Sequence, residues 1–469
     1  MQNKGEFTMS ESKKDLLGYK KTNFYEVATP EQIQAAYDYC VDYAKYLDAS
    51  KTEREAVATS IAMAEAQGYV PYTFGMELAK GGKYYYNNRG RSLFLFRIGS
   101  EPVQNGIRIC AAHIDSPRLD LKQSPLYEDG GFGFFKTRYY GGVRKYQWVA
   151  TPLALHGVIV KQDGEVVKVT IGEDESDPVL YINDLLPHLG QSQNAQPLGS
   201  AIPAENLNIL LGSRPLEGEE SDKIKMNILN LLNEKYGIVE ADFLSADLSI
   251  VPAAKARDVG LDRSLIGSYG HDDRVCAYPA LTALFECPDA ARTTMVILAD
   301  KEEIGSDGDT GMQCELLLDL LYEIAKAFGA NFGAMKANSV CMSADVTACF
   351  DPNFAEVFDG KNVSRINCGI CMCKYTGHGG KVATNDASAE LVAFIRRIMA
   401  KGEVVWQAGD MGKNDIGGGG TVAKYISKHN IPTIDMGVPV IAMHSPFEIV
   451  SKADVYTAHK AFVAFYSFD

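Results

Sequence analysis

The sequence lacks long apolar runs. None of its 469 residues falls in a stretch long enough to cross a membrane, and residues 1–23 are polar, without the apolar core of a secretion signal. We therefore expect a cytoplasmic protein with no membrane partner.

Positive charge is also scarce: 46 lysine and arginine residues stand against 60 acidic ones, for a formal net charge of -14. A surface of this sign repels phosphate backbones, so we expect no nucleic-acid partner. Ten cysteines are too few for a disulfide framework, and several lie inside apolar runs, which indicates reduced, buried thiols. Cys368, Cys371 and Cys373 lack a second pair of ligands at zinc-ribbon spacing, so we assign them a structural role in a strand.

Apolar residues make up 46% of the chain, enough for more than one hydrophobic core. The first and last thirds alternate strands with helices, which predicts an α/β fold with a mainly parallel sheet flanked by helices. The middle third instead contains hairpins, such as 155–170, and long polar loops. We therefore predict one domain of residues 1–118 and 257–469, interrupted by an inserted β-rich domain of residues 119–256.

Two adjacent carboxylates, Glu302 and Glu303, follow the apolar strand predicted over 294–298. In a regular strand they would point to opposite faces, so a shared site requires the backbone to turn, and Gly305 favours such a turn. By itself the pair is more typical of a solvated acidic turn.

Four further segments with histidine or acidic residues lie at predicted strand ends or helix starts. With the glutamate pair, the segments are 113–115, 271–273, 302–303, 343–345 and 443–445. Mixed imidazole and carboxylate ligands suit zinc, cobalt or manganese. Two histidines with several carboxylates exceed the needs of one ion, so the pattern favours a two-metal site with a bridging carboxylate.

These segments resemble the aspartyl aminopeptidases of the M18 metallopeptidase family, in particular its prokaryotic branch. The resemblance is carried by His113-Ile114-Asp115-Ser116-Pro117, Asp272-Asp273-Arg274-Val275, Asp300-Lys301-Glu302-Glu303-Ile304-Gly305-Ser306, Ser343-Ala344-Asp345 and Met443-His444-Ser445. It implies a fold of the di-zinc exopeptidase type with an inserted dimerisation domain.

The same resemblance implies a role for each site residue. His113 and Asp345 would hold one ion, Glu303 and His444 the other, and Asp272 would bridge the two. Asp115 would orient His113, and Glu302 would act as general base. Asp273 stands where many relatives have asparagine, so we do not expect it to be a ligand.

Three features are candidates for substrate binding. Gly418, Gly419 and Thr421 belong to a glycine-rich segment whose amides could hold a substrate terminus or an oxyanion; the alternative is a flexible loop. Lys374 lies where similar enzymes place a basic residue for an acidic substrate side chain. His156 could reach the active site of a neighbouring subunit, as a similar histidine does in relatives, or be structural.

We therefore expect a two-metal aminopeptidase that removes N-terminal residues from short peptides, and we expect these residues to be acidic (Asp or Glu). Two zinc ions per subunit are expected, with cobalt or manganese as alternatives. The resemblance implies a homo-oligomer, a tetrahedral dodecamer built through the inserted domain. Two other functions stay open from sequence: a related carboxypeptidase or deacylase, and a catalytically silent self-assembling scaffold.

Overall fold

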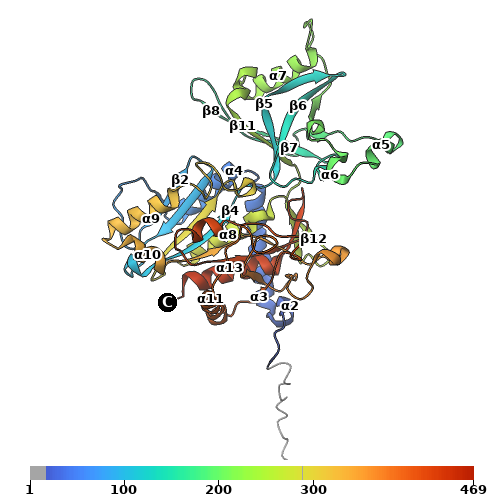
Figure 1. Cartoon of the computed structure of the whole chain (residues 1–469). Coiled ribbons are helices and arrows are strands. Elements are labelled where there is room, and N and C mark those ends of the chain that lie inside the picture. Colours follow the sequence, from blue (N-terminus) through green and yellow to red (C-terminus); the bar gives the residue numbers. More distant parts are fainter. Residues whose placement is uncertain (1–16, 288, 469) are drawn as a thin grey trace, which may run out of the picture.

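A computed structural model describes residues 17–287 and 289–468, so most of the polar segment 1–23 lies outside the described residues. Two large sheets dominate the molecule, one above the other in Figure 1. Among the described residues, no helix combines the length and the apolar character that crossing a bilayer requires.

The larger sheet has nine strands and is mainly parallel. Its order is β1 (Val70–Pro71), β2 (Lys83–Asn88), β3 (Ser92–Arg97), β14 (Thr293–Ala299), β4 (Ile107–His113), β15 (Val340–Ser343), β19 (Thr433–Gly437), β17 (Ile370–Cys373) and β18 (Trp406–Ala408). The central strands β14, β4, β15 and β19 are all parallel. The predicted α/β fold with a mainly parallel sheet is confirmed.

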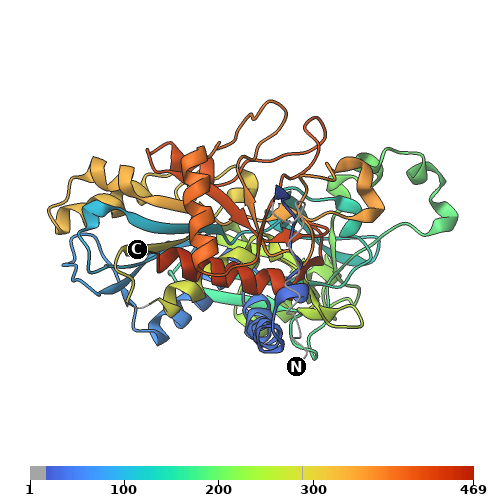
Figure 2. The same cartoon turned by 90° about the horizontal axis from the view of Figure 1, so that it is seen from below.

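Helices cover both faces of this sheet, which is visible from below in Figure 2. One face carries α3 (Pro30–Asp48), α4 (Glu53–Ala66), α8 (His271–Glu286), α11 (Ala389–Lys401) and α13 (Lys452–Tyr466); the other carries α9 (Leu316–Ala327), α10 (Phe332–Asn338) and α12 (Ala423–Ser427). Successive strand residues alternate between the two cores: Leu95 packs in the first and Phe96 in the second. Burial on both faces explains the nearly continuous apolar strands.

Capping residues set the starts of the first two long helices. Thr29 accepts a hydrogen bond from the Gln32 amide, and the Gln32 side chain accepts one from the Thr29 amide. Thr52 and Glu55 repeat this arrangement at α4. Each pair forms a capping box, which satisfies two backbone amides at the start of its helix.

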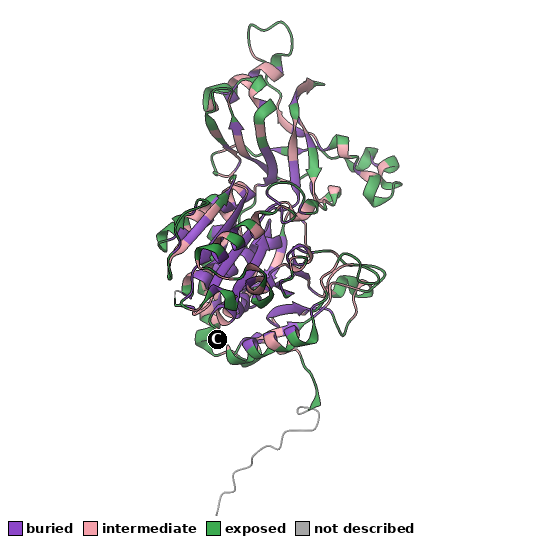
Figure 3. Ribbon diagram, turned by 60° about the vertical axis from the view of Figure 1, so that its left-hand side comes forward, coloured by how far each residue is buried: buried purple, intermediate pink, exposed green. Residues whose placement is uncertain are grey.

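The second sheet has seven strands with antiparallel pairings. Its order is β8 (Val166–Ile171), β7 (Leu153–Val160), β11 (Ala246–Pro252), β5 (Arg118–Asp129), β6 (Phe132–Tyr140), β10 (Ile209–Gly212) and β9 (Tyr181–Ile182). Together with α7 (Lys223–Tyr236) it encloses a separate apolar core that includes Trp148, Ile228 and Leu232. In Figure 3 the buried residues are concentrated in the strands of both sheets, and the long connections of the upper part are exposed.

Five short strands form two further, smaller sheets. These are β12 (Arg257–Val259), β13 (Leu265–Ser268) and β21 (Glu448–Ser451) in one sheet, and β16 (Thr347–Ala348) with β20 (Pro439–Val440) in another. Of these, the sequence pattern predicted none. The helix α12 that follows the glycine-rich segment is short and spans only Ala423–Ser427.

Candidate metal centre

Five parts of the chain deliver the predicted site residues to one edge of the nine-stranded sheet. His113 ends β4, Asp345 follows β15, and Glu303 follows β14. Since these three strands are parallel neighbours, their carboxyl ends coincide, which is where open α/β sheets bind ligands. Asp272 enters from the start of α8, and His444 from the connection between β20 and β21.

The structure brings the ligand atoms into two groups that share one carboxylate. His113, Asp272 and Asp345 form one group, and Asp272, Glu303 and His444 the other; within each group the atoms lie within 4.8 Å of one another. His113 Nε2 lies 3.0 Å from Asp272 Oδ1, and His444 Nε2 lies 3.1 Å from Asp272 Oδ2. Asp272 therefore lies between two potential ion positions, one at each oxygen.

Irregular backbone after β14 turns the Glu302–Glu303 pair towards the site. Lys301 has a φ of 66° and Gly305 a φ of 97°, and they flank a single 3-10 turn over Glu302–Ile304. This is the departure from strand geometry that the glutamate pair required, with Gly305 in the left-handed region.

Asp115 connects the first histidine with the glutamate pair. Its side chain lies 3.3 Å from His113 Nδ1, and its backbone oxygen lies 3.0 Å from the same nitrogen. The carboxylate also accepts hydrogen bonds from the backbone amides of Glu302 at 3.1 Å and Glu303 at 3.2 Å. Asp115 thus fixes the position of one candidate ligand and of the turn that carries the other two carboxylates.

Glu448 makes a similar connection on the other side of the site. The sequence analysis did not identify this residue. Its buried carboxylate accepts hydrogen bonds from the His444 amide at 2.6 Å and the Asp272 amide at 3.1 Å. It thereby joins two candidate ligands from separate elements. Only its place four residues beyond His444 could have drawn attention to it.

Crowding of acids dominates the electrostatics of the site. Burial and nearby carboxylates raise the pKa of Glu302 to about 7 and hold the pKa values of Glu303 and Asp345 well above the ordinary range. Although burial opposes it, hydrogen bonding to Asp272 raises the pKa of His444 to about 10. The pKa of His113 is raised in the same way by Asp115 and Asp272.

The residues fit divalent cations. Five carboxylates and two imidazoles meet in a buried space, and Glu303 Oε1 is buried without a hydrogen-bond donor among the described residues. Buried carboxylates need compensating charge, which cations at the two ligand groups would supply. Imidazole nitrogen with carboxylate oxygen is a ligand set of zinc.

The two residues that flank Asp272 in the sequence, His271 and Asp273, lie outside the ligand groups. His271 Nδ1 lies 2.8 Å from the Tyr43 hydroxyl, and burial lowers the pKa of His271 to about 3. Asp273 accepts a hydrogen bond from the His113 amide, and burial raises the pKa of Asp273 well above its usual range. Neither residue belongs to a ligand group.

A cavity of about 460 Å³ opens over the candidate ligands. Gly418, Gly419 and Thr421 line it, as do Lys424 and Tyr425. The Thr421 hydroxyl is engaged elsewhere, because it donates to Asp435 at 2.7 Å. A second cavity, of about 420 Å³, shares Asp345, Gly418 and Thr421 with the first and is also lined by Lys381.

Lys374 and His156 are placed differently from the expected ligands. Lys374 does not line either cavity; its ammonium lies 2.7 Å from Asp386, which also pairs with Lys381 at 2.8 Å. Buried His156 lies in β7, and its two ring nitrogens contact Glu55 at 2.9 Å and Glu173 at 3.0 Å within the same chain. The structure does not bring either residue to the ligand groups.

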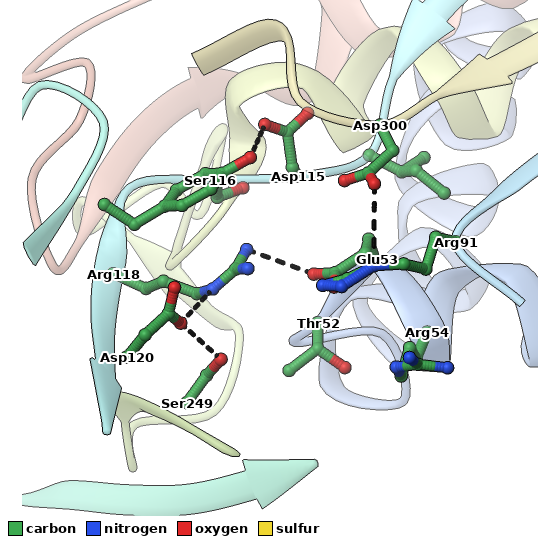
Figure 4. Close-up of polar contacts among 12 residues, drawn as sticks. Thr52, Glu53, Arg54, Arg91, Asp115, Ser116, Arg118, Asp120, Ser249 and Asp300 are labelled. Carbon is green, nitrogen blue, oxygen red and sulfur yellow. Dashed lines mark hydrogen bonds and ion pairs between the residues drawn. The ribbon is translucent and has the colours of Figure 1, made fainter. Parts of the chain in front are cut away.

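An ion-pair network centred on the buried residues Glu53 and Arg118 lies behind Asp115 at the junction of the two sheets (Figure 4). Glu53, at the start of α4, lies between Arg118 at 3.0 Å and Arg91 at 3.0 Å. Arg118 also pairs with Asp120 at 2.8 Å, and Arg91 lies 3.6 Å from Asp300. This network joins the second sheet to the strand that leads into the glutamate pair.

Comparison with known proteins assigns the chain a family. Residues 46–466 match the family described as aminopeptidase I zinc metalloprotease (M18). A probable M18 family aminopeptidase 1 from Clostridium acetobutylicum is 46% identical over 461 residues, covering 96% of this chain and 99% of that protein. A crystal structure of an M18 aminopeptidase from Thermotoga maritima superimposes with a TM-score of 0.90 at 40% identity, covering 96% of this chain and 99% of the other. The mApe1 dodecamer of S. cerevisiae has the same fold at 20% identity, with a TM-score of 0.76, covering 92% of this chain and 97% of that one.

Proposed function

Since this chain belongs to the M18 family of zinc metalloproteases and is a metallo-aminopeptidase, we propose that it uses two zinc ions to remove acidic N-terminal residues from short peptides. Family membership supports the aminopeptidase function over the carboxypeptidase, deacylase and scaffold alternatives. The observation that carries the two-ion proposal is the sharing of Asp272 between the two ligand groups.

In this proposal His113, Asp345 and Asp272 would hold one zinc ion, and Glu303, His444 and Asp272 would hold the other. When bound, two such ions polarise the scissile carbonyl and make a water molecule acidic enough to ionise near neutral pH. Cobalt or manganese could occupy the same nitrogen and oxygen ligands.

Glu302 moves the proton. Its carboxylate lines the cavity over the ligand groups without belonging to either of them, so it is placed to accept a proton there and release it again. It takes the proton from the attacking water and passes it to the leaving amine. Asp115 keeps the Glu302 backbone in place for this transfer.

The Glu302–Glu303 pair offers a direct test with matched substitutions. We predict that Glu302→Gln lowers kcat by about 10²- to 10⁴-fold and retains both zinc ions, because the lost group handles protons. Glu303→Gln should lose zinc as well as activity, because the lost group is a ligand. Zinc content by mass spectrometry and initial rates on aspartyl amide check both. Loss of both ions from Glu302→Gln would contradict these roles.

The proposed acidic preference rests on one basic side chain at the second cavity. Lys381 lines this cavity together with Asp345, Asp410 and Asp435, and it shares the carboxylate of Asp386 with Lys374. Of the two lysines, Lys381 is thus better placed than the predicted Lys374 to meet an acidic side chain. Initial rates on aspartyl, glutamyl, leucyl and lysyl amides, with zinc, cobalt and manganese in turn, test this. Equal rates for acidic and apolar residues would refute it.

We propose further that residues 119–256 form an inserted domain through which subunits assemble into a tetrahedral dodecamer. The separate core of the second sheet supports the division, and its two outermost strands, β8 and β9, each pair on one side only among the described residues. The likeness to the S. cerevisiae dodecamer is consistent with this assembly. Analytical ultracentrifugation should give twelve times the 51.2 kDa chain mass; a monomer would refute the proposal.

A further inference from the structure

The turn after β6 places residues of the second sheet directly against the candidate metal ligands. This turn begins with Tyr140-Gly141-Gly142. The Gly142 carbonyl lies 3.2 Å from His444 Nδ1, the ring nitrogen that faces away from Asp272. The Tyr140 hydroxyl donates a hydrogen bond to Asp115 Oδ2 at 2.8 Å. One short turn therefore contacts groups on both sides of the site.

Neighbouring atoms leave no room for a side chain at Gly141 or Gly142. A Cβ atom on Gly142 would lie 2.6 Å from His444 Nδ1, closer than real Cβ atoms approach. A Cβ atom on Gly141 would lie 3.1 Å from Glu303 Oε2, and Gly141 also has a φ of 72°. The turn thus packs against Glu303 and His444, two of the three ligands of the second ion position, and only glycine permits this approach.

The ring of Tyr140 is in turn positioned by another residue of the second sheet. The Arg118 guanidinium, at the start of β5, lies 4.1 Å from the centre of the Tyr140 ring. Arg118 is buried and fixed by Glu53 and Asp120, as Figure 4 shows. The hydroxyl that meets Asp115 is therefore positioned by the ion-pair network at the junction of the sheets.

We propose that Tyr140, Gly141 and Gly142 are positioning residues, through which the second sheet holds the Glu303–His444 ion position of its own subunit. The inference rests on the proposed two-ion function. A hydrogen bond from Nδ1 to the Gly142 carbonyl selects the tautomer whose Nε2 is free to bind a cation. The Tyr140 hydroxyl holds Asp115, which in turn holds the amides of Glu302 and Glu303.

Through these contacts the second sheet has a role in catalysis besides assembly. The sheet and the ligands are joined by short contacts, so a shift of the second sheet displaces His444 and Glu303 together. His113 and Asp345 belong to the nine-stranded sheet and have no such contact with the two glycines of the turn. The two glycines therefore act on one of the two ion positions, whereas Tyr140 acts through Asp115, which also contacts His113 of the other position.

The inference is tested with the substitution Gly142→Ala, and Gly131→Ala is its matched control. Gly131 lies in the β5–β6 turn at the far end of the same hairpin, with a φ of 88°, and a Cβ atom added there would meet nothing within 4 Å. Zinc affinity is measured by competition with a chromophoric chelator, beside unfolding of the zinc-free proteins in urea. We expect Gly142→Ala to bind one of its two zinc ions about 10- to 100-fold more weakly, and Gly131→Ala to keep both affinities.

Wild-type zinc affinity at both positions in Gly142→Ala would overturn the inference. So would equal losses in the two alanine variants, since these would reflect general strain. A wild-type chain that binds fewer than two zinc ions would instead overturn the proposed function, and this inference with it.

Tyr140→Phe provides a second test that removes only one hydroxyl. Its control is Tyr139→Phe, because Tyr139 is the neighbouring residue of β6 and is 48% exposed. In the cobalt-substituted proteins we expect Tyr140→Phe to shift the visible absorption spectrum and lower kcat about tenfold with KM unchanged. Tyr139→Phe should match the wild type. An unchanged spectrum in Tyr140→Phe would exclude a positioning role for its hydroxyl.

Discussion

At the scale of single residues, protons compete with cations for the two histidines. The pKa of His444 is raised to about 10 and that of His113 is also raised, so both imidazoles carry a proton at neutral pH in the metal-free chain. A cation must displace these protons before it can bind.

We therefore predict that zinc binding releases protons and tightens as the pH rises from about 6 towards 9. Isothermal titration calorimetry near pH 7, in buffers with different enthalpies of ionisation, measures the number released. His444→Gln should release fewer protons than the wild type, and His429→Gln, outside the ligand groups, should not differ from it. A binding enthalpy that is the same in all buffers would contradict the prediction.

Glu448 shows that a residue can support the site without facing the substrate. Its carboxylate accepts from the His444 and Asp272 amides, so Glu448→Ala leaves both buried donors unsatisfied. We predict a loss of about 1–3 kcal/mol in the free energy of unfolding and an about 10- to 100-fold weaker zinc affinity. Urea unfolding and chelator competition measure these. Glu448→Gln keeps one acceptor oxygen and should be intermediate; an alanine variant with wild-type affinity would contradict the role.

At the scale of elements, a buried cluster ties α4 to the second sheet. His156 in β7 contacts Glu55 of α4 and Glu173, and Lys51 lies 2.6 Å from Glu173. Burial disfavours the charged imidazole, but the two carboxylates outweigh burial and raise the pKa of His156 above its ordinary value.

A raised pKa contributes stability that is complete below the unfolded value of about 6.5 and is lost as the pH rises through the folded value. We predict that His156→Gln lowers the free energy of unfolding more at about pH 6 than at about pH 9. Each unit by which the pKa is raised corresponds to about 1.4 kcal/mol. Urea unfolding at both pH values checks this, with the exposed His188→Gln as control. An equal loss at both pH values would exclude a contribution from the charged imidazole.

The sequence predicted the elements that carry the site more readily than the contacts that join them. Buried strands such as β4 and β14 have nearly continuous apolar patterns, so the positions of His113 and Glu303 beyond them were evident. Glu448 acts by accepting backbone amides, and no residue spacing encodes that. Gly142 comes from another sheet, so its contact with His444 depends on how the two sheets pack.

At the scale of the whole molecule, bound cations link distant parts of the chain. The candidate ligands follow three strands of the nine-stranded sheet and also come from α8 and the β20–β21 connection. Cations that bind only the folded chain stabilise it, by about 2.7 kcal/mol for each site at a ligand concentration of about 100 Kd.

We predict that removing zinc with a chelator lowers Tm and that adding zinc back restores it. Differential scanning calorimetry measures the shift. Glu302→Gln should show the full shift, because its ligands remain, and Asp272→Asn should show less, because the shared carboxylate is altered. An identical Tm with and without zinc would contradict a structural effect of the ions.

The order of the ligands along the chain has a consequence for synthesis. They run from residue 113 to residue 444, with the whole second sheet between His113 and Asp272. A nascent chain therefore cannot assemble the second ion position until residue 444 has left the ribosome. Hydrolysis that depends on both ion positions therefore requires a nearly complete chain.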